Sequence, residues 1–543
     1  MAVSLWLISP RFAIKGPSLI DDWSAIAASP HQVSSVGRLF SVYDTRFRPG
    51  WIVWNYLQWH TLGAPLQMLG PNLWDVLRLA VFGVGVSGLT VVLLGLRQAH
   101  GSLMLAAAAA FVAPLLVLTT PNVATDFARF GPQEPLLVGL LALGGSLLIL
   151  GGRALATRPW PAGVLLTLGS AVWIAGVYQK ETSVCVLVLL PFLYLAHRAQ
   201  VGEVLRRLDR RGRFVAGAAT AAVILPIGHV AVEVVLITRR GPLVYGAQPT
   251  YGGGAVHKTY EFLSKMQTST NSYVGWLLLA GLCVPVATGV VRRRPDWLLS
   301  GLLATSAVCL VWNAQTGEAA TRYYIPSLAL SAVGCAIALA ELRGRSAKTM
   351  LVVVVVLVAA AGDQLRIWSS RPGLLLSHEA ILAAVVAAVL VTVALARRGA
   401  RPEAVAALAL LVLIAGSARI AHRSVLAWAQ DDEHGWQLVQ AVSDARESGC
   451  PVVISDLDPE RTAAVPIVSA LHLSARSNAT CNGRAYFVVG PAGGSATLAA
   501  TCAPRTQESA GGWVLQGEHV RLLRCETAST PTARRILGKQ RIR

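Results

Sequence analysis

Long apolar runs repeat along most of the 543-residue chain. A run of about 20 apolar residues is long enough to cross the ~30 Å hydrocarbon core of a bilayer as an α-helix. Residues 1–14 are too short to cross alone and resemble the last half of one further span. The pattern therefore predicts a polytopic α-helical membrane protein of about 12 to 13 transmembrane helices, with full spans at 74–97, 103–119, 135–151, 160–178, 183–197, 214–237, 273–291, 296–312, 323–341, 348–365, 379–396 and 404–420.

Two regions depart from this pattern and complete the predicted domain organisation around a bundle at 74–420. Residues 15–73 are polar and rich in Trp, which is typical of a loop with short helices at the membrane interface. In residues 421–543, "EHGWQLVQAVSDARESGC" has helical periodicity, "PVVISDLDP" and "AYFVVGP" resemble strands, and "WVLQGEHVRLLRC" resembles a hairpin. The tail is therefore expected to form a small α/β domain that ends in a basic segment.

The positive charges predict the orientation of the bundle. Only 14% of the residues are charged, yet the net charge is +19. Basic residues concentrate in alternate short loops, which are expected to be cytoplasmic. This assignment places the first loop and the C-terminal domain outside the cell membrane. Nucleic-acid binding is disfavoured, because the basic residues are dispersed and not interleaved with stacking aromatics. The basic loops contain Arg97, Arg153, Arg158, Arg198, Arg206, Arg207, Arg210, Arg211, Arg213, Arg292, Arg293, Arg294, Arg343, Arg345, Lys348, Arg397, Arg398 and Arg401.

The cysteines agree with this orientation. Four of the eight lie in apolar spans, where a free Cys behaves as a small hydrophobe. The other four, Cys450, Cys481, Cys502 and Cys525, lie in the tail. An even number of cysteines in an extracytoplasmic domain predicts two disulfides, with three possible pairings. No Cys or His spacing resembles a zinc site.

Ionisable residues collect in the predicted outer loops. Such residues are costly at membrane depth, so they are candidates for function. They occur in "IDDW", "YDTRFRPGW", "TDFARFGPQEP", "YQKETS" and "GEAATRYYIP". These segments contain Asp21, Asp22, Asp44, Arg46, Arg48, Asp126, Arg129, Glu134, Lys180, Glu181, Glu318, Arg322, Tyr323 and Tyr324.

Each group also has a structural interpretation. Asp21 and Asp22 are typical of a helix N-terminus, where acids favour the dipole. Lys180 and Glu181 can extend to the interface as an adjacent pair. Interfacial anchoring explains Arg129, Glu134 and Arg322, and Asp44 is expected to be structural, with Arg46 and Arg48 bound to it or to lipid phosphate. The functional interpretation depends on the prediction that all these loops lie on the same, extracytoplasmic side of the membrane.

A mixed acidic and basic surface at the membrane suits a lipid-linked anionic substrate. Arg binds phosphate as a bidentate fork and Lys binds it as a point charge. A carboxylate beside an acceptor hydroxyl can act as a general base. One base, a cationic cradle for a departing lipid phosphate and a carbohydrate groove together indicate glycosyl transfer.

The order of these motifs resembles the GT-C superfamily of membrane glycosyltransferases. Members use polyprenyl-phosphate-linked sugars and have a modified DxD motif in the first external loop, to which Asp21-Asp22-Trp23 is similar. "RFRPGW", "RFGPQEP", "QKET" and "RYYIP" are also similar to motifs of bacterial members. The first span is incomplete here, which is a departure from the family pattern.

The resemblance implies roles for particular residues in an inverting single displacement. Asp22 or Asp21 is expected to deprotonate the acceptor, an envelope glycan or glycolipid. Arg322 and Lys180, with Tyr323, are expected to bind the donor phosphate. The site would be organised by Arg129, Glu134, Glu181, Asp44 and Arg48. A divalent cation (Mg, Mn or Ca) is an open possibility, and no metal ligand is assigned.

Two alternative functions use the same features. A lipid-linked glycan polymerase or ligase usually relies on Arg and His in a large outer loop late in the bundle, whereas the long loop here is the first one and carries acids. A lipid or glycan transporter without catalysis would be expected to show inverted repeats and Gly/Pro-interrupted helices at matching positions. The sequence shows no such symmetry.

Overall fold

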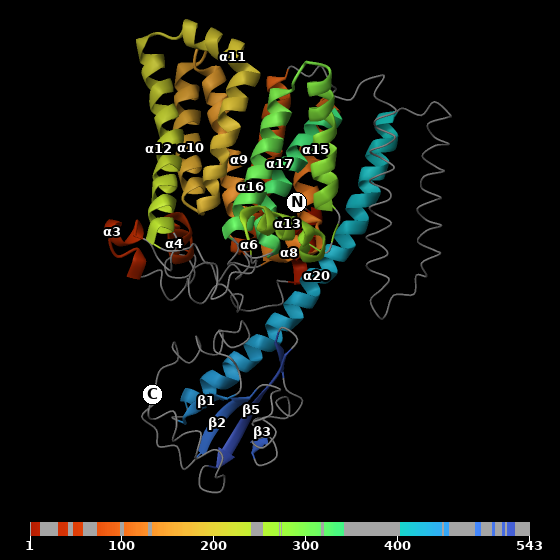
Figure 1. The fold of residues 1–543 in the computed structure, drawn as a ribbon. Coiled ribbons are helices and arrows are strands. Elements are labelled where there is room, and N and C mark those ends of the chain that lie inside the picture. Colours follow the sequence, from red (N-terminus) through yellow and green to blue (C-terminus); the bar gives the residue numbers. More distant parts are fainter. Residues whose placement is uncertain are drawn as a thin grey trace. The chain divides into compact units, whose positions relative to one another are not determined.

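The computed structural model describes most of the bundle and part of the C-terminal region. The described residues are 2–10, 31–41, 47–57, 73–97, 103–128, 133–240, 253–270, 272, 274–316, 320–340, 402–447, 450–455, 484–489, 502–504, 513–515 and 518–526. The contacts divide the chain into a membrane unit and a C-terminal unit, with the division in the helix α20 (Pro402–Glu447), between Val425 and Leu426. Figure 1 shows the elements of both units.

Within the described part of the membrane unit, seven helices are long and apolar enough to cross a membrane, or eight if one bent pair is a single span. This result confirms the predicted polytopic helical fold. The longer helices of the unit are α6 (Leu73–Leu96), α7 (Leu103–Leu118), α9 (Glu134–Ala154), α10 (Pro159–Val177), α11 (Leu189–Arg207), α12 (Arg210–Arg240), α15 (Val274–Val291), α16 (Trp297–Thr316) and α17 (Ile325–Ala340).

Short elements connect these helices at one end of the unit (Figure 1). They are α4 (Pro49–Tyr56), α8 (Pro121–Ala128), α13 (Ala255–Ser264), α14 (Met266–Thr270), and the 3₁₀ helices η3 (Glu181–Val188) and η4 (Thr321–Tyr324). Two further short helices are α1 (Ala2–Ile8) and α3 (Val36–Leu39). Most of these short elements lie in the predicted outer loops, whereas η3 overlaps the start of the predicted span at 183–197.

The predicted span at 103–119 ends at a sharp bend. The axis of α8 turns by 87° from that of α7. Pro121 is the first residue of α8, where its missing N–H costs nothing and its fixed φ favours a helix start. Seven of the eight residues of α8 are buried, and Asn122 is half-buried. The segment after the bend is therefore a packed part of the fold rather than a solvated loop.

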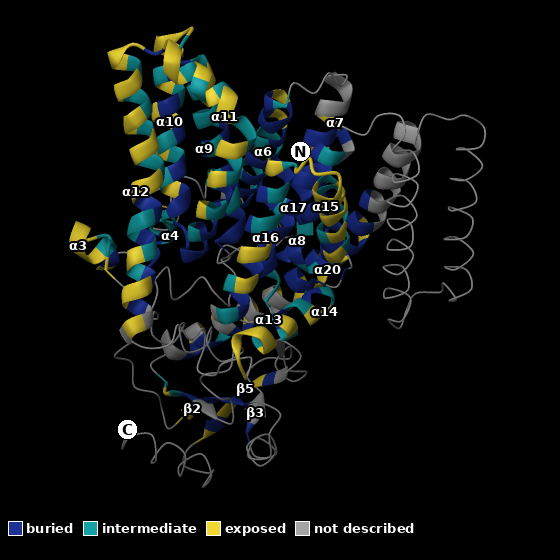
Figure 2. Cartoon of the chain, turned by 45° about the horizontal axis from the view of Figure 1, so that its top comes forward, coloured by how far each residue is buried: buried dark blue, intermediate teal, exposed yellow. Residues whose placement is uncertain are grey.

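Glycines allow the central helices to approach one another closely. A Cβ on Gly139 of α9 would lie 2.8 Å from the backbone nitrogen of Phe82 in α6. A Cβ on Gly144 would lie 2.7 Å from the backbone nitrogen of Trp173 in α10. Small residues let membrane helices pack backbone against backbone, which partly replaces the hydrophobic driving force that lipid removes. Figure 2 shows the resulting buried positions on α6, α9 and α17 and the exposed surface of α12.

Three predicted features lie wholly or partly outside the described residues. The predicted spans at 348–365 and 379–396 lie there, as does most of the first loop. The partial first helix is represented by α1, and the predicted span at 404–420 lies within α20.

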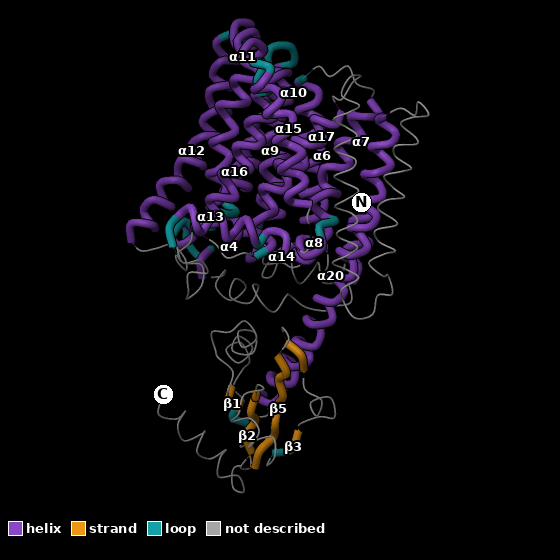
Figure 3. Tube along the Cα trace, turned by 45° about the vertical axis from the view of Figure 1, so that its right-hand side comes forward, coloured by secondary structure: helices purple, strands orange, loops and turns teal. Residues whose placement is uncertain are grey.

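The C-terminal unit has the predicted α/β character (Figure 3). Its strands are β1 (Val452–Ser455), β2 (Arg484–Val489), β3 (Ala503–Pro504), β4 (Trp513–Leu515) and β5 (Glu518–Glu526). The sheet order is β1-β2-β5-β3, with β1 parallel to β2, and β4 forms the predicted hairpin with β5. Alternate residues of β2 face opposite sides, so Tyr486 and Val488 pack on the end of α20 while Ala485, Phe487 and Val489 form a second core.

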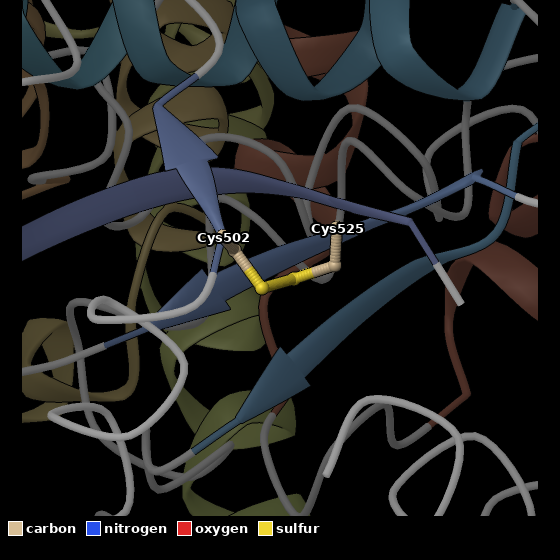
Figure 4. The surroundings of a disulfide bond; sticks show 2 residues. All are labelled: Cys502 and Cys525. Atoms are coloured by element: carbon tan, nitrogen blue, oxygen red, sulfur yellow. A yellow bond between two sulfur atoms is a disulfide. The ribbon is translucent and has the colours of Figure 1, made fainter. Parts of the chain in front are cut away.

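One disulfide pairing in this unit is resolved. Cys502 and Cys525 are bonded, with their Cα atoms 4.7 Å apart (Figure 4). Cys450 is also disulfide-bonded. Cys185, Cys283, Cys309 and Cys335, which were assigned to apolar spans, are free thiols.

Candidate functional site

The candidate site lies at the end of the membrane unit where α4, α8, η3 and η4 meet the first turn of α9. The backbone N–H of Gly50 donates to the carbonyl of Tyr178 over 2.9 Å, which joins the "RFRPGW" segment to "YQKET". A Cβ on Gly50 would lie 2.9 Å from the carbonyl carbon of Tyr178. Glycine is therefore required for this close approach, which brings two of the predicted motifs together.

Arg48 and Glu181 form a buried ion pair. The Nε atom of Arg48 lies 3.0 Å from Oε2 and 3.2 Å from Oε1 of Glu181. The backbone N–H of Phe47 donates to the same Oε1 over 3.0 Å. The two side chains are only 6% and 4% exposed. Two donors, the Nε–H of Arg48 shared between both oxygens and the N–H of Phe47, therefore satisfy a carboxylate that would otherwise be costly to bury.

Lys180 and Glu134 form a second buried ion pair beside the first. The ammonium group of Lys180 donates to Oε1 of Glu134, and both side chains are 2% exposed. The same ammonium group lies 4.1 Å from the centroid of the Tyr323 ring, which is a cation–π contact. Glu134 is the first residue of α9, where a negative charge also stabilises the helix dipole.

Arg322 adds a third cation to this cluster. Its guanidinium carbon lies 5.2 Å from the centroid of the Tyr323 ring. We use the name "charged cluster" for Arg48, Glu134, Lys180, Glu181 and Arg322 together with the Tyr323 ring. Its three cationic and two acidic side chains leave one excess positive charge when all are ionised.

The excess positive charge acts on Lys180. The pKa of Lys180 is lowered from its ordinary value of 10.5 to about 7, and burial is the largest cause. The Glu134 carboxylate opposes this shift, whereas the neighbouring guanidinium groups of Arg48 and Arg322 contribute to it. An anion that binds in this cluster would favour the protonated lysine, because it adds the negative charge that the cluster lacks.

Hydrogen bonds fix η4 beside the cluster. Thr321 donates from its hydroxyl to Oδ2 of Asp126 in α8 over 2.5 Å. Asn313 of α16 donates from Nδ2 to the carbonyl of Tyr323 over 2.7 Å. The hydroxyl of Tyr324 donates to the carbonyl of Phe262 in α13 over 2.7 Å. These contacts hold Arg322 and Tyr323 in place from three separate elements.

A further buried ion pair, which the sequence motifs do not include, lies near this end. Asp75 and Arg78, in the first turns of α6, lie 3.5 Å apart with side chains 0% and 3% exposed. Arg78 also donates from Nη2 to the carbonyl of Phe127 over 2.5 Å, which connects α6 to α8. The available signal was an acid and a base three residues apart at the start of an apolar span, since such residues are seldom left at membrane depth without a role.

The structure brings together most of the predicted site residues that it describes. Glu134, Lys180, Glu181, Arg48, Arg322 and Tyr323 form the charged cluster, although they come from four separate predicted loops. The interpretation of Lys180 and Glu181 as a pair extending to the interface is wrong, because both are buried in contacts with other segments. Asp21, Asp22, Asp44 and Arg129 lie outside the described residues.

The described residues offer no obvious metal site. No three His, Cys, Asp or Glu side chains among them are grouped so that they could hold an ion. Glu134 and Glu181 are each bonded to a cationic side chain, while Oε2 of Glu134 is buried without a hydrogen-bond partner. The charged cluster therefore contains more cationic than acidic side chains.

Comparisons with known proteins identify the fold. No protein-family model and no curated protein matches the chain. A crystal structure of ArnT from Cupriavidus metallidurans in the apo state matches with a TM-score of 0.53 and 14% identity, over 97% of each chain. The structure of the same protein bound to undecaprenyl phosphate matches with a TM-score of 0.55 and 13% identity, again over 97% of each chain. The predicted GT-C-like fold is thereby confirmed: this chain has the fold of ArnT.

Proposed function

We propose that the protein is an integral membrane glycosyltransferase that takes its sugar from a polyprenyl-phosphate-linked donor. The observation that carries the proposal is the charged cluster, which lies at one end of a fold shared with ArnT. A structure of ArnT holds undecaprenyl phosphate, so a protein with this fold binds a lipid phosphate. The distribution of basic loops supports an extracytoplasmic position for this end.

The charged cluster supplies a cradle for a departing phosphate. Arg322 and Lys180 are cations that can neutralise phosphate oxygens, and both lie against the Tyr323 ring. Glu134 and Glu181 hold Lys180 and Arg48 in fixed positions through their ion pairs. Fixed charges stabilise a developing negative charge without reorganising during the reaction. The pKa of Lys180 is about 7 in the described arrangement. The negative charge of a bound phosphate would raise this pKa and so keep Lys180 protonated.

The transfer itself is proposed as a single displacement. The acceptor hydroxyl oxygen forms a bond to the anomeric carbon while the bond from that carbon to the lipid phosphate breaks. Asp22, or Asp21, takes the proton of the hydroxyl as a general base, and the lipid phosphate leaves with the electron pair. The configuration of the anomeric carbon is inverted, and no protein nucleophile is needed. Arg129 and Asp44 are proposed to help organise this site.

The proposed acceptor is an envelope glycan or glycolipid. A divalent cation (Mg, Mn or Ca) remains a proposal that depends on Asp21, Asp22 and Asp44, because the described carboxylates of the charged cluster are bonded to cations. Such an ion, if held there, would neutralise negative charge on the donor. The phosphate contacts of Arg322 and Lys180 do not depend on it.

A transfer assay on purified protein in lipid tests the function. The assay supplies a panel of radiolabelled polyprenyl-phosphate sugars with acceptor extracts from envelope preparations. Wild type is compared with Asp21→Asn/Asp22→Asn and with a matched control, Glu203→Gln/Asp209→Asn, which changes acids at the opposite end of the bundle. We expect label to move to a new product with wild type and control only. A wild-type protein that transfers sugar from no donor would remove the proposed function, and equal transfer by the double Asn variant would remove the acid pair as base.

A further inference from the structure

A second candidate site lies at the opposite, basic end of the membrane unit. An apolar cavity of about 410 Å³ lies among α9, α10, α11 and α12. Its walls include Leu148 and Ile149 of α9, Leu193 and Val204 of α11, and Ala219 of α12. Small-molecule sites in proteins usually have volumes of ~300–1,000 Å³, so this cavity is large enough for part of a ligand.

A polar cavity adjoins the apolar one. It has a volume of about 500 Å³ and is lined by Arg97, Arg294 and Asp296 at the ends of α6 and α16. Leu96, His197 and Gln200 line both cavities and so mark their boundary. The helix α11 departs from helical geometry at His197 (φ −124°, ψ 16°), at the level of this boundary. Because the two cavities share part of their lining, an apolar half and a polar half of one candidate site lie side by side.

The charges around this space favour an anionic headgroup. Arg97 is held by Asp296 over 2.5 Å. Arg153 lines the apolar cavity and Arg294 lines the polar one, and neither forms an ion pair with a carboxylate of the described residues. One guanidinium group in the lining of each cavity is therefore available to a negatively charged ligand.

The apolar half communicates with the lipid-facing surface. Tyr194 and Leu205 line the cavity, yet they are 59% and 46% exposed. Exposed apolar residues on a membrane helix face lipid chains rather than water. Trp160, at the start of α10, is 80% exposed, as is typical of a residue at the level of lipid headgroups. A ligand with an acyl chain can therefore enter from the bilayer.

We propose that the paired cavities bind one anionic phospholipid of the leaflet at the basic end. Its acyl chain occupies the space between α9 and α12, and its phosphate lies between Arg153 and Arg294. Basic pockets between membrane helices on the cytoplasmic side suit anionic lipid headgroups. The positive-inside pattern of the chain places the pocket in that leaflet. The site is separate from the charged cluster, which lies at the other end of the helices.

Native mass spectrometry of the full-length protein in detergent tests this site. The protein is incubated with dioleoyl phosphatidylglycerol, with dioleoyl phosphatidylcholine or with undecaprenyl phosphate. We expect one molecule of phosphatidylglycerol to be retained in preference to phosphatidylcholine. The double variant Arg153→Ala/Arg294→Ala should lower retention by about 30-fold, taking the usual contribution of an arginine beside anionic lipid for each residue. The matched control Arg158→Ala/Arg292→Ala changes two arginines of the same end that do not line the cavities and should retain the lipid.

A second variant tests the apolar half. Gly152 lines the cavity, and a Cβ added there meets nothing within 4 Å, so Gly152→Leu fills space without a backbone clash. Its control is Gly217→Leu, a glycine of α12 that is equally open but does not line the cavity. We expect Gly152→Leu to lose the lipid and Gly217→Leu to keep it. Equal retention by all variants, or no preference for phosphatidylglycerol over phosphatidylcholine, would overturn the proposal. Preferential retention of undecaprenyl phosphate in this pocket would reassign it to the lipid carrier and overturn the phospholipid assignment.

Discussion

The two ends of the membrane unit use charged residues in opposite ways. At the end with the charged cluster, Lys180 and Glu134 are 2% exposed and bonded to each other. At the basic end, Arg207 and Glu203 also form an ion pair, but their side chains are 64% and 58% exposed. The two pairs contain similar residue types, but the free-energy cost of removing them from water is larger for the buried pair.

The exposed charges of the basic end are explained by membrane topology, whereas the buried charges of the cluster are not. An exposed ion pair contributes little to stability, typically below ~1 kcal/mol. A buried pair pays a desolvation penalty that its own attraction often fails to recover, so apolar residues would stabilise the fold equally well or better. The buried charges of the cluster are therefore poorly explained by stability alone, which supports a role in binding.

The largest expected effect is on stability. Replacing Glu134 by Ala leaves the Lys180 ammonium buried without its carboxylate, and breaking a buried pair in this way typically costs about 3–5 kcal/mol. Glu203→Ala, at the exposed pair, should change the free energy of unfolding by less than about 0.5 kcal/mol. Equilibrium unfolding in mixed micelles measures both. Similar values for the two variants would break the comparison between the ends.

A double replacement separates stability from function. Glu134→Leu/Lys180→Met removes both charges and keeps apolar volume, so its stability should stay close to that of wild type. Sugar transfer should nevertheless fall by about 100-fold, because one donor to a developing negative charge is lost. The measurement is initial rate of transfer by protein whose unfolding midpoint has been checked. Full activity in a stable double variant would show that this pair is structural.

A smaller effect is expected from the cation at the edge of the cluster. Arg322→Ala removes a charge-assisted contact that we assign to the donor phosphate, which is worth about 2 kcal/mol, or about 30-fold in donor affinity. Titration of a non-transferable polyprenyl phosphate measures this affinity directly. Arg206→Ala, at the basic end, serves as the control and should bind the donor normally. An unchanged donor affinity in Arg322→Ala would count against its phosphate role.

The smallest expected effect concerns the support of η4. Thr321→Val removes the hydroxyl that donates to Asp126 and keeps the side-chain shape. We expect a loss of about 1 kcal/mol in the free energy of unfolding, the usual net value of one hydrogen bond. Thr321→Ser, which keeps the hydroxyl, should restore most of this loss. A Val variant as stable as wild type would show that Asp126 does not need this contact.

Sequence patterns predicted the fold and the members of the cluster better than its pairings. Apolar runs have a length fixed by the bilayer, so most spans of the described bundle were correct to a few residues. Lys180 and Glu181 are candidates from sequence because ionisable residues are costly at membrane depth. Their partners, Glu134 and Arg48, lie 46 and 133 residues away, and nothing local in the sequence selects one distant partner over another.

Two other features were beyond local patterns. The ion pair between Arg48 and Glu181 accompanies the close approach of Gly50 to Tyr178, which no local pattern indicates. The expectation that Arg48 binds Asp44 or lipid stays a prediction, because Asp44 lies outside the described residues. The cavities at the basic end lie among four helices and beside the kink of α11, and neither the helix spacing nor the kink leaves a periodic signal in the sequence.

The 3₁₀ winding of η3 has a mechanical consequence for Glu181. A 3₁₀ helix rises ~2.0 Å and turns ~120° per residue, whereas an α-helix rises ~1.5 Å and turns ~100°. If the eight residues of η3 rewound as an α-helix on a fixed α11, Glu181 would descend by about 4 Å and rotate by about 160°. It would then face away from Arg48 and Phe47. The number of residues per turn in η3 therefore sets both the position of the Glu181 carboxylate along the helix axis and the direction in which it points.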